Sequence, residues 1–62
     1  MQYVFLKSGV IIRFNPEKCE FSFNQRGYFA GDVGLMLPGE TGYHNVESFT
    51  FNMDEISCHW VK

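Results

Sequence analysis

Apolar and polar residues alternate with a period of two in three separate stretches of this chain. Residues 19–24 and 48–52 each place two phenylalanines on one side and polar residues on the other, and residues 56–60 repeat the pattern. Because successive side chains of a strand point to opposite faces, this alternation predicts strands with one buried and one solvated face. The side chains expected to point inward are Phe5, Phe21, Phe23, Phe49, Phe51, Ile56 and Trp60.

Two further strands are expected near the beginning of the chain, over residues 2–7 and 10–15. Ser8 and Gly9 lie between them and suit a two-residue primed hairpin turn in which glycine takes a positive φ. Both strands carry β-branched and aromatic residues on both faces, which indicates burial on two sides or an oligomer contact.

Turn residues divide the remainder of the chain. Residues 15–17 (Asn-Pro-Glu) predict a turn before a strand over residues 18–24, and residues 24–27 predict a second turn. Strands over residues 46–51 and 56–61 are expected to be joined by one 3₁₀ turn, in which Asn52 or Asp54 caps backbone N–H groups.

The segment from Gly31 to Asn45 differs from the rest because it combines four glycines and a proline with large apolar residues. Residues 33–37 are compatible with a short strand, whereas residues 38–42 predict a loop. This segment is therefore expected to be the longest irregular stretch of the chain.

The strand pattern predicts a small all-β domain that spans residues 1–62. Five or six short antiparallel strands without a helix of useful length indicate a meander curled into a barrel or half-barrel. The ending, a strand, a single 3₁₀ turn and a last strand, resembles that of SH3-like and Sm-like barrels, and this resemblance implies the same architecture here.

Length and charge limit the classes of function. A chain of 62 residues buries only about 60% of its unfolded surface, so a partner surface or a second copy is expected to stabilise the fold. The net charge is −2 and the five basic residues are scattered, which disfavours general nucleic-acid affinity. No apolar run approaches the length of a membrane span, and the strand pattern begins at once without a signal-peptide pattern, so a cytoplasmic location is expected.

The side chains with reactive groups do not form a recognisable catalytic or metal-binding motif. Cys19 and Cys58 fit small core residues best, although a disulfide between them stays open, and a reactive thiol is the least favoured interpretation. His59 follows Cys58 in a strand, so their side chains point to opposite faces and do not share a metal ion. His44 and His59 are instead expected to be exposed or hydrogen-bonded. We therefore expect neither an enzyme nor a cofactor or metal.

These observations favour a non-enzymatic protein-interaction module, with the partner-binding residues in the segment from Gly31 to Asn45. An alternative is that Leu35 and Leu37 face the core and only Met36 is exposed. The candidate partner-binding residues are Asp32, Leu35, Met36, Leu37, Glu40 and Tyr43. A two-fold homodimer is also expected, joined through an apolar face or an edge strand such as residues 4–6.

Two other classes of function stay open. The first is the binding of single-stranded nucleic acid or a nucleotide on an aromatic face, with Arg13 and Arg26 supplying positive potential. The aromatic residues considered for such a face are Tyr28, Phe29, Tyr43 and Trp60. The second is a small subunit with a role in assembly alone.

Two stretches resemble small phage or prophage β-proteins in general character. These are residues 4–12 (VFLKSGVII) and residues 51–56 (FNMDEI), which together cover about a quarter of the chain. The resemblance implies an accessory protein that binds and modulates or inhibits a host protein.

Overall fold

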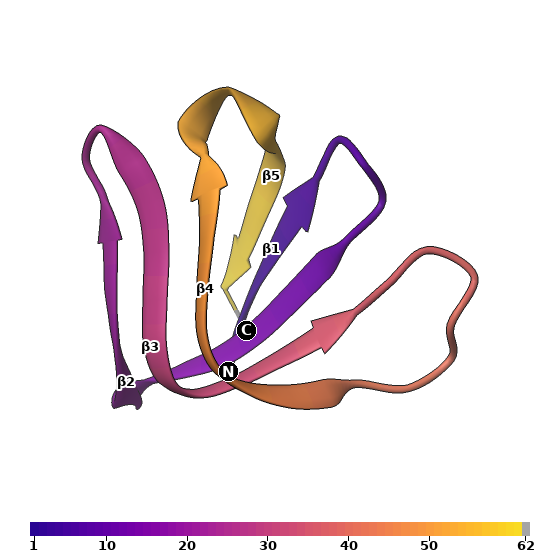
Figure 1. Ribbon diagram of the computed structural model, residues 1–62, viewed down its shortest axis with the longest axis horizontal. Coiled ribbons are helices and arrows are strands. Elements are labelled where there is room, and N and C mark those ends of the chain that lie inside the picture. Colours follow the sequence, from indigo (N-terminus) through magenta and orange to yellow (C-terminus); the bar gives the residue numbers. More distant parts are fainter. Residues whose placement is uncertain (62) are drawn as a thin grey trace.

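The computed structural model describes residues 1–61 and contains a single antiparallel sheet of five strands (Figure 1). The strands lie in the order β4-β3-β2-β1-β5, and within the described residues the 3₁₀ turn η1 is the one helical element. This confirms the predicted all-β class and the 3₁₀ turn before the last strand. The elements are β1 (Gln2–Leu6), β2 (Ile11–Phe23), β3 (Arg26–Met36), β4 (His44–Asn52), η1 (Met53–Glu55) and β5 (Ile56–Val61).

β2 and β3 are long, strongly bent strands, which corrects two sequence predictions. Residues 15–17 do not reverse the chain but lie inside β2, and residues 31–36 belong to β3. The register of this strand pair shifts between Phe14 and Cys19, at the bend. There the side chain of Asn15 accepts a hydrogen bond from the Glu17 N–H (3.0 Å), and Gly31 adopts φ +114° close to the Lys18 carbonyl oxygen. The turn residues therefore bend one strand instead of ending it.

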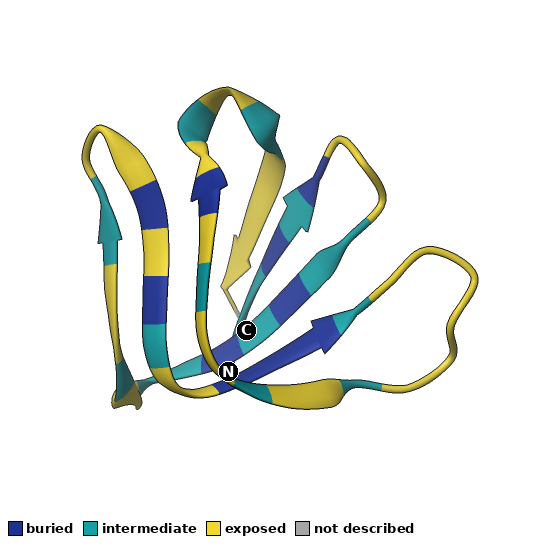
Figure 2. Ribbon diagram, in the orientation of Figure 1, coloured by how far each residue is buried: buried dark blue, intermediate teal, exposed yellow. Residues whose placement is uncertain are grey.

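The bend folds the sheet around a core on its concave face, where the cross-strand partners place the buried side chains. Figure 2 shows the strand positions that are buried. The Phe14 and Phe29 rings are fully buried, with centroids 4.7 Å apart. At about 25 cal/mol per Å² of apolar surface, such rings contribute much of the favourable free energy of folding. The buried apolar residues are Val4, Leu6, Ile12, Phe14, Phe29, Val33, Leu35 and Phe51.

The predicted inward set is correct in part. Phe51 is buried, and Phe23, Phe49 and Ile56 are half-buried against the core. Phe21 points inward as predicted and contacts the Phe14 ring, but it is 41% exposed and is not a buried core residue. Trp60 is 58% exposed, and both Trp60 and Phe5 lie on the convex face, so the prediction that they point inward is wrong. The alternation of a strand does not reveal which of two apolar faces is covered.

The β1–β2 connection differs in type from the predicted primed turn. The Gly9 N–H donates to the Leu6 carbonyl (3.0 Å), and Gly9 has φ +98°. Lys7 and Ser8 lack the positive φ that a type I′ turn requires. The connection is therefore a turn centred on Lys7 and Ser8 that ends in a glycine bulge.

Two strands that follow one another in the chain form the two edges of the sheet. β4 and β5 are joined by η1, yet β5 pairs only with β1 and β4 only with β3 within residues 1–61. The Glu55 side chain accepts a hydrogen bond from the Asn52 N–H across this connection (3.1 Å). The sheet is a half-barrel in the described residues. β1 is paired on both sides, so the prediction that residues 4–6 form an edge is wrong.

The two thiols are free and lie on opposite faces of the sheet. Cys19 is half-buried and packs against the core, while Cys58 is exposed and pairs with Phe5 on the convex face. The prediction that both are core residues is therefore wrong for Cys58, and the structure has no bridge between them. Among the described residues, no helix has the length and apolar character needed to cross a membrane.

Candidate functional site

The convex face carries two rows of side chains that run across neighbouring strands. One row joins Trp60, Tyr3, Arg13 and Gly34, which are successive cross-strand partners on β5, β1, β2 and β3. Directly opposite residues of antiparallel strands project from the same face and contact one another. The parallel row contains Cys58, Phe5, Ile11 and Met36.

An open groove of about 350 Å³ lies on this face and is lined by aromatic rings from three parts of the chain. Tyr3 and Phe5 come from β1, Trp60 from β5, and Tyr43 from the end of the β3–β4 loop. We call this surface the aromatic groove. Tyr3, Phe5 and Tyr43 are half-buried, whereas Trp60 is 58% exposed. The groove thus brings one exposed ring and three half-buried rings together at one place on the surface.

Arg13 supplies a positive charge beside the aromatic groove. Its guanidinium carbon lies 4.1 Å from the centroid of the Tyr43 ring, a cation–π distance. Tyr43 reaches this position over Gly34, because a Cβ on Gly34 would lie 3.4 Å from the Tyr43 Cβ. While it stacks on the ring, the guanidinium has N–H groups that can donate hydrogen bonds to a carboxylate or carbonyl oxygen.

The β3–β4 loop, residues 37–43, is held by one side chain. Leu37 to Glu40 form a turn in which Gly39 has φ +84° and the Glu40 N–H donates to the Leu37 carbonyl (3.1 Å). Pro38 followed by glycine suits a type II turn. Glu40 Oε1 accepts from the Leu37 N–H (3.2 Å), and Glu40 Oε2 lies 3.0 Å from His44 Nε2. The hydrogen bond from His44 is the main cause that lowers the pKa of Glu40 from its usual value.

The structure separates the six predicted partner-binding residues. Tyr43 lines the aromatic groove, and Met36 lies half-buried in the row beside it. Leu37 is 47% exposed in the loop. Glu40 is exposed, but its carboxylate is engaged within the loop.

The two other predicted residues lie elsewhere. Leu35 is buried in the core, as the alternative prediction had it, so its side chain is not available to a partner; the same alternative is wrong for Leu37. Asp32 is exposed at the bend of β3, beside the Gly31 that lies against β2. The binding surface proposed below therefore keeps Met36 and Tyr43 from this set.

Sequence reasoning missed Tyr3 and Phe5 as site residues, and it named Arg13 and Trp60 only for the alternative aromatic face that binds nucleic acid or a nucleotide. The available signal was the apolar and aromatic character of residues 2–7 and 10–15 on both faces. In a half-barrel with one core, the second apolar face of such strands has no internal partner.

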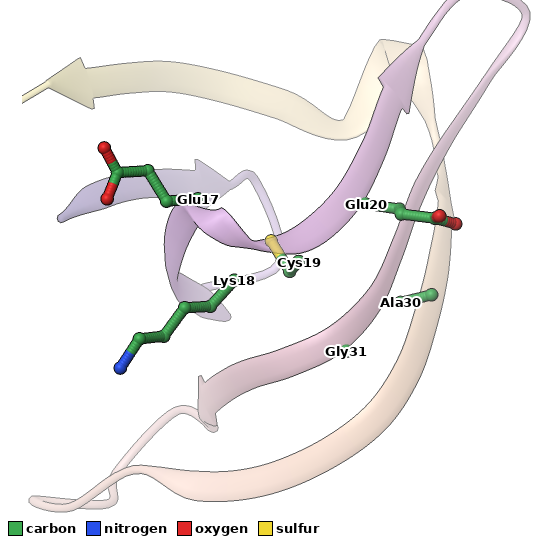
Figure 3. A pocket seen from close by; sticks show the side chains of 6 residues that line it. All are labelled: Glu17, Lys18, Cys19, Glu20, Ala30 and Gly31. Carbon is green, nitrogen blue, oxygen red and sulfur yellow. The ribbon is translucent and has the colours of Figure 1, made fainter.

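A second hollow of about 460 Å³ lies at the bend of β2 and β3 (Figure 3). Burial, with a smaller contribution from the charge of Asp32, raises the pKa of the Cys19 thiol, which disfavours the nucleophilic thiolate. Figure 3 shows Glu17, Lys18 and Glu20 pointing in different directions away from Cys19, so the charged groups do not converge on one point. This arrangement suits neither general acid–base nor nucleophilic catalysis.

Both histidines are exposed and hydrogen-bonded, as predicted. His59 lies on the concave side of β5, where its Nε2 is 2.9 Å from the Gln2 side-chain oxygen and its ring lies 5.8 Å from that of Phe23. His44 pairs with Glu40. No group of three or more potential metal-ligating side chains occurs in residues 1–61.

Comparison of the chain with models of protein families, with curated proteins and with solved structures found no match.

Proposed function

We propose that this protein is a non-enzymatic interaction module that binds another protein through the aromatic groove. One observation carries the proposal: the rings of Trp60, Tyr3, Phe5 and Tyr43 line one open groove, with Arg13 stacked beside it. Tryptophan, tyrosine and arginine are the residues that most often dominate the binding energy of protein interfaces. Exposed apolar surface that is concentrated in one place is typical of interaction sites.

The chemistry of the groove favours a particular kind of partner segment. The rings offer apolar contact, and the Arg13 guanidinium adds a hydrogen-bond donor with a positive charge. We expect a partner that inserts an apolar side chain and places a carboxylate or carbonyl oxygen near Arg13. Such a role agrees with an accessory protein that modulates its target, which stays a prediction from the sequence resemblance.

Recognition of single-stranded nucleic acid or a nucleotide is the second candidate. The observation that favours it is the juxtaposition of Arg13, Tyr43 and Trp60 on one face of a β-sheet, where bases stack in several nucleic-acid-binding folds. The net charge of −2 favours the protein partner over this candidate, because nucleic-acid affinity depends on the neutralisation of several phosphates.

The test compares matched variants in a capture experiment. Tyr43→Ala and Trp60→Ala remove groove rings, whereas Tyr28→Ala removes a tyrosine that is 39% exposed and pairs with Ser22 and Thr50, outside the groove. We expect the wild type and Tyr28→Ala to capture the same protein. The affinity of this protein for purified Tyr43→Ala or Trp60→Ala should be at least about tenfold lower than for the wild type. Equal capture by all variants would contradict the proposal.

A labelled-oligonucleotide titration separates the two candidates. If the groove binds nucleic acid, affinity falls steeply as salt rises and is lost in Arg13→Met. If it binds protein, we expect no saturable binding of single-stranded oligonucleotides at physiological salt.

A further inference from the structure

β5 is exposed along nearly its whole length, which distinguishes it from every other strand (Figure 2). Residues 57–61 are all exposed, and the side chains include Trp60 at 58% and Val61 at 65%. Within residues 1–61, β1 is the one strand hydrogen-bonded to β5. The opposite edge of β5 therefore presents backbone N–H and C=O groups that are free to pair with a further strand.

The other edge of the sheet, β4, is better protected against pairing than β5. The exposed residues of β4 are all polar or charged and include Glu47. Ile56 to Val61 contain no aspartate, glutamate, lysine, arginine or proline. Edge strands that avoid pairing carry such residues, so β5 lacks the usual protection and β4 has part of it.

From these observations we propose that a second copy of this chain pairs with the free edge of β5, antiparallel and about a two-fold axis. Each copy offers the same unpaired strand, and two-fold symmetry makes one such strand complementary to another. The absence of charged residues in β5 means that no like charges meet across the axis. The outer edges of the dimer are then the two polar β4 strands, which limits assembly to two copies.

The area that a stable interface needs indicates which side chains take part. A standard interface covers about 800 Å² on each partner, about a fifth of the 4199 Å² that this chain exposes. One strand edge of six residues supplies only part of this area, so the sides of the flanking apolar side chains that face the second copy are covered as well, whereas the side of the Trp60 ring that lines the aromatic groove stays open. Trp60 flanks the edge on the convex face and Val61 on the concave face.

This arrangement goes beyond the proposed function because it makes the binding surface bivalent. The convex faces of the two sheets are continuous across paired β5 strands, so the two aromatic grooves lie side by side. Each copy then extends the groove of the other with its own β5. A partner with two equivalent segments binds such a surface more tightly than one groove alone.

The first test is sedimentation of the full chain between about 1 and about 100 μM. We expect the mass to rise with concentration from 7.2 kDa to about twice that value. Ser57→Lys and Val61→Lys place a charge at exposed positions of β5, and they are expected to raise the dissociation constant of the dimer at least about tenfold. The matched controls Ser48→Lys and Thr50→Lys lie at exposed positions of β4 and should leave the dissociation constant of the dimer unchanged.

A second measurement decides the question if the lysine variants do not fold. Cys58 is an exposed thiol on β5, so a short bis-maleimide should cross-link two copies in the wild type and in Cys19→Ser but not in Cys58→Ser. A single 7.2 kDa species at every concentration overturns the proposal, as does cross-linking through Cys19 alone or loss of the dimer only in the β4 variants. Partner capture by monomeric Ser57→Lys tests the aromatic groove separately.

Discussion

The ring of Phe51 occupies the space that a Cβ of Gly27 would need. The two residues are cross-strand partners of β3 and β4, and an ideal Cβ on Gly27 would overlap three atoms of the ring. Phe51 is only 5% exposed and stacks on Phe29, so its ring is packed into the core. Glycine at position 27 is therefore a packing requirement of the core.

We expect Gly27→Ala to lower the free energy of unfolding by about 1–3 kcal/mol, because the added methyl group forces Phe51 out of its position. Gly42→Ala is the matched control, since no atom lies within 4 Å of its ideal Cβ. This variant should lie within about 0.5 kcal/mol of the wild type. Urea denaturation followed by circular dichroism measures both changes, and equal stabilities would show that the core near Phe51 is loosely packed.

Two phenylalanines that face each other across β2 and β3 should differ sharply in their effect on stability. Phe29 is fully buried, whereas its partner Phe21 is 41% exposed. We expect Phe29→Ala to cost about 3–5 kcal/mol, because it creates a cavity, and Phe21→Ala to cost less than half as much. Thermal and chemical unfolding of the two variants gives the comparison. A similar loss for both would mean that Phe21 is covered in solution, for instance by a second chain.

The sequence predicted the fold class because alternation is a local property, whereas the extent of the strands is not. The pattern correctly predicted the all-β class, the loop over residues 38–42, the 3₁₀ turn η1 and the bounds of β5. It divided β2 at Pro16 because turn residues look the same whether they reverse a strand or bend it. Whether such residues bend the strand or reverse it depends on the partner strand, and here Gly31 permits the close approach of β3 to the bend.

The candidate site was harder to predict than the fold because it is assembled across strands. Met36 and Tyr43 belong to a segment whose composition is unusual, so the sequence indicated them. Tyr3, Arg13 and Trp60 come together only through the register of β1 with β2 and β5. The same register placed Leu35 and Met36 on opposite faces, which composition alone does not distinguish.

Glu40 should make the order of the β3–β4 loop dependent on pH. Its pKa is lowered, first by the hydrogen bond from His44 and then by the Leu37 N–H, so folding favours the ionised carboxylate. The stabilisation is complete above the ordinary glutamate pKa of about 4.3 and is lost as the pH falls through the lower pKa of the folded state. We expect the protection of the Leu37 amide against hydrogen exchange, relative to the intrinsic rate at the same pH, to fall in acid.

Glu40→Gln should remove most of this pH dependence while it leaves the strands intact. In His44→Ala the pKa of Glu40, followed by NMR, should move back toward its ordinary value. An unchanged titration of Glu40 in His44→Ala would mean that the two side chains are not paired in solution.

The stacking of Arg13 on Tyr43 should fix the position of the loop on the convex face. We expect a double-mutant cycle of Arg13→Met and Tyr43→Leu to give a coupling of about 0.5–1 kcal/mol, the size of an exposed cation–π contact. Arg13→Lys keeps the charge but loses the planar stack, so it tests whether the geometry matters. Coupling near zero in unfolding experiments would indicate that the Tyr43 ring moves freely.

Leu35 and Met36 are neighbours in β3 whose replacement should affect different properties. Leu35 is buried in the core, and Leu35→Ala is expected to cost about 2–5 kcal/mol of stability. Met36 lies on the convex face opposite Ile11, beside the aromatic groove. Met36→Asp places a charge there and should weaken binding of the captured partner by about 1 kcal/mol or more, with little change in the melting temperature.

Urea unfolding and a binding titration with the purified partner separate these two effects. The expected pattern is an unstable Leu35→Ala that still binds at low temperature, and a stable Met36→Asp that binds weakly. If Met36→Asp unfolds the domain, the convex face is part of the structural core. If it binds with the affinity of the wild type, the interaction surface does not extend along the row from Phe5 to Met36.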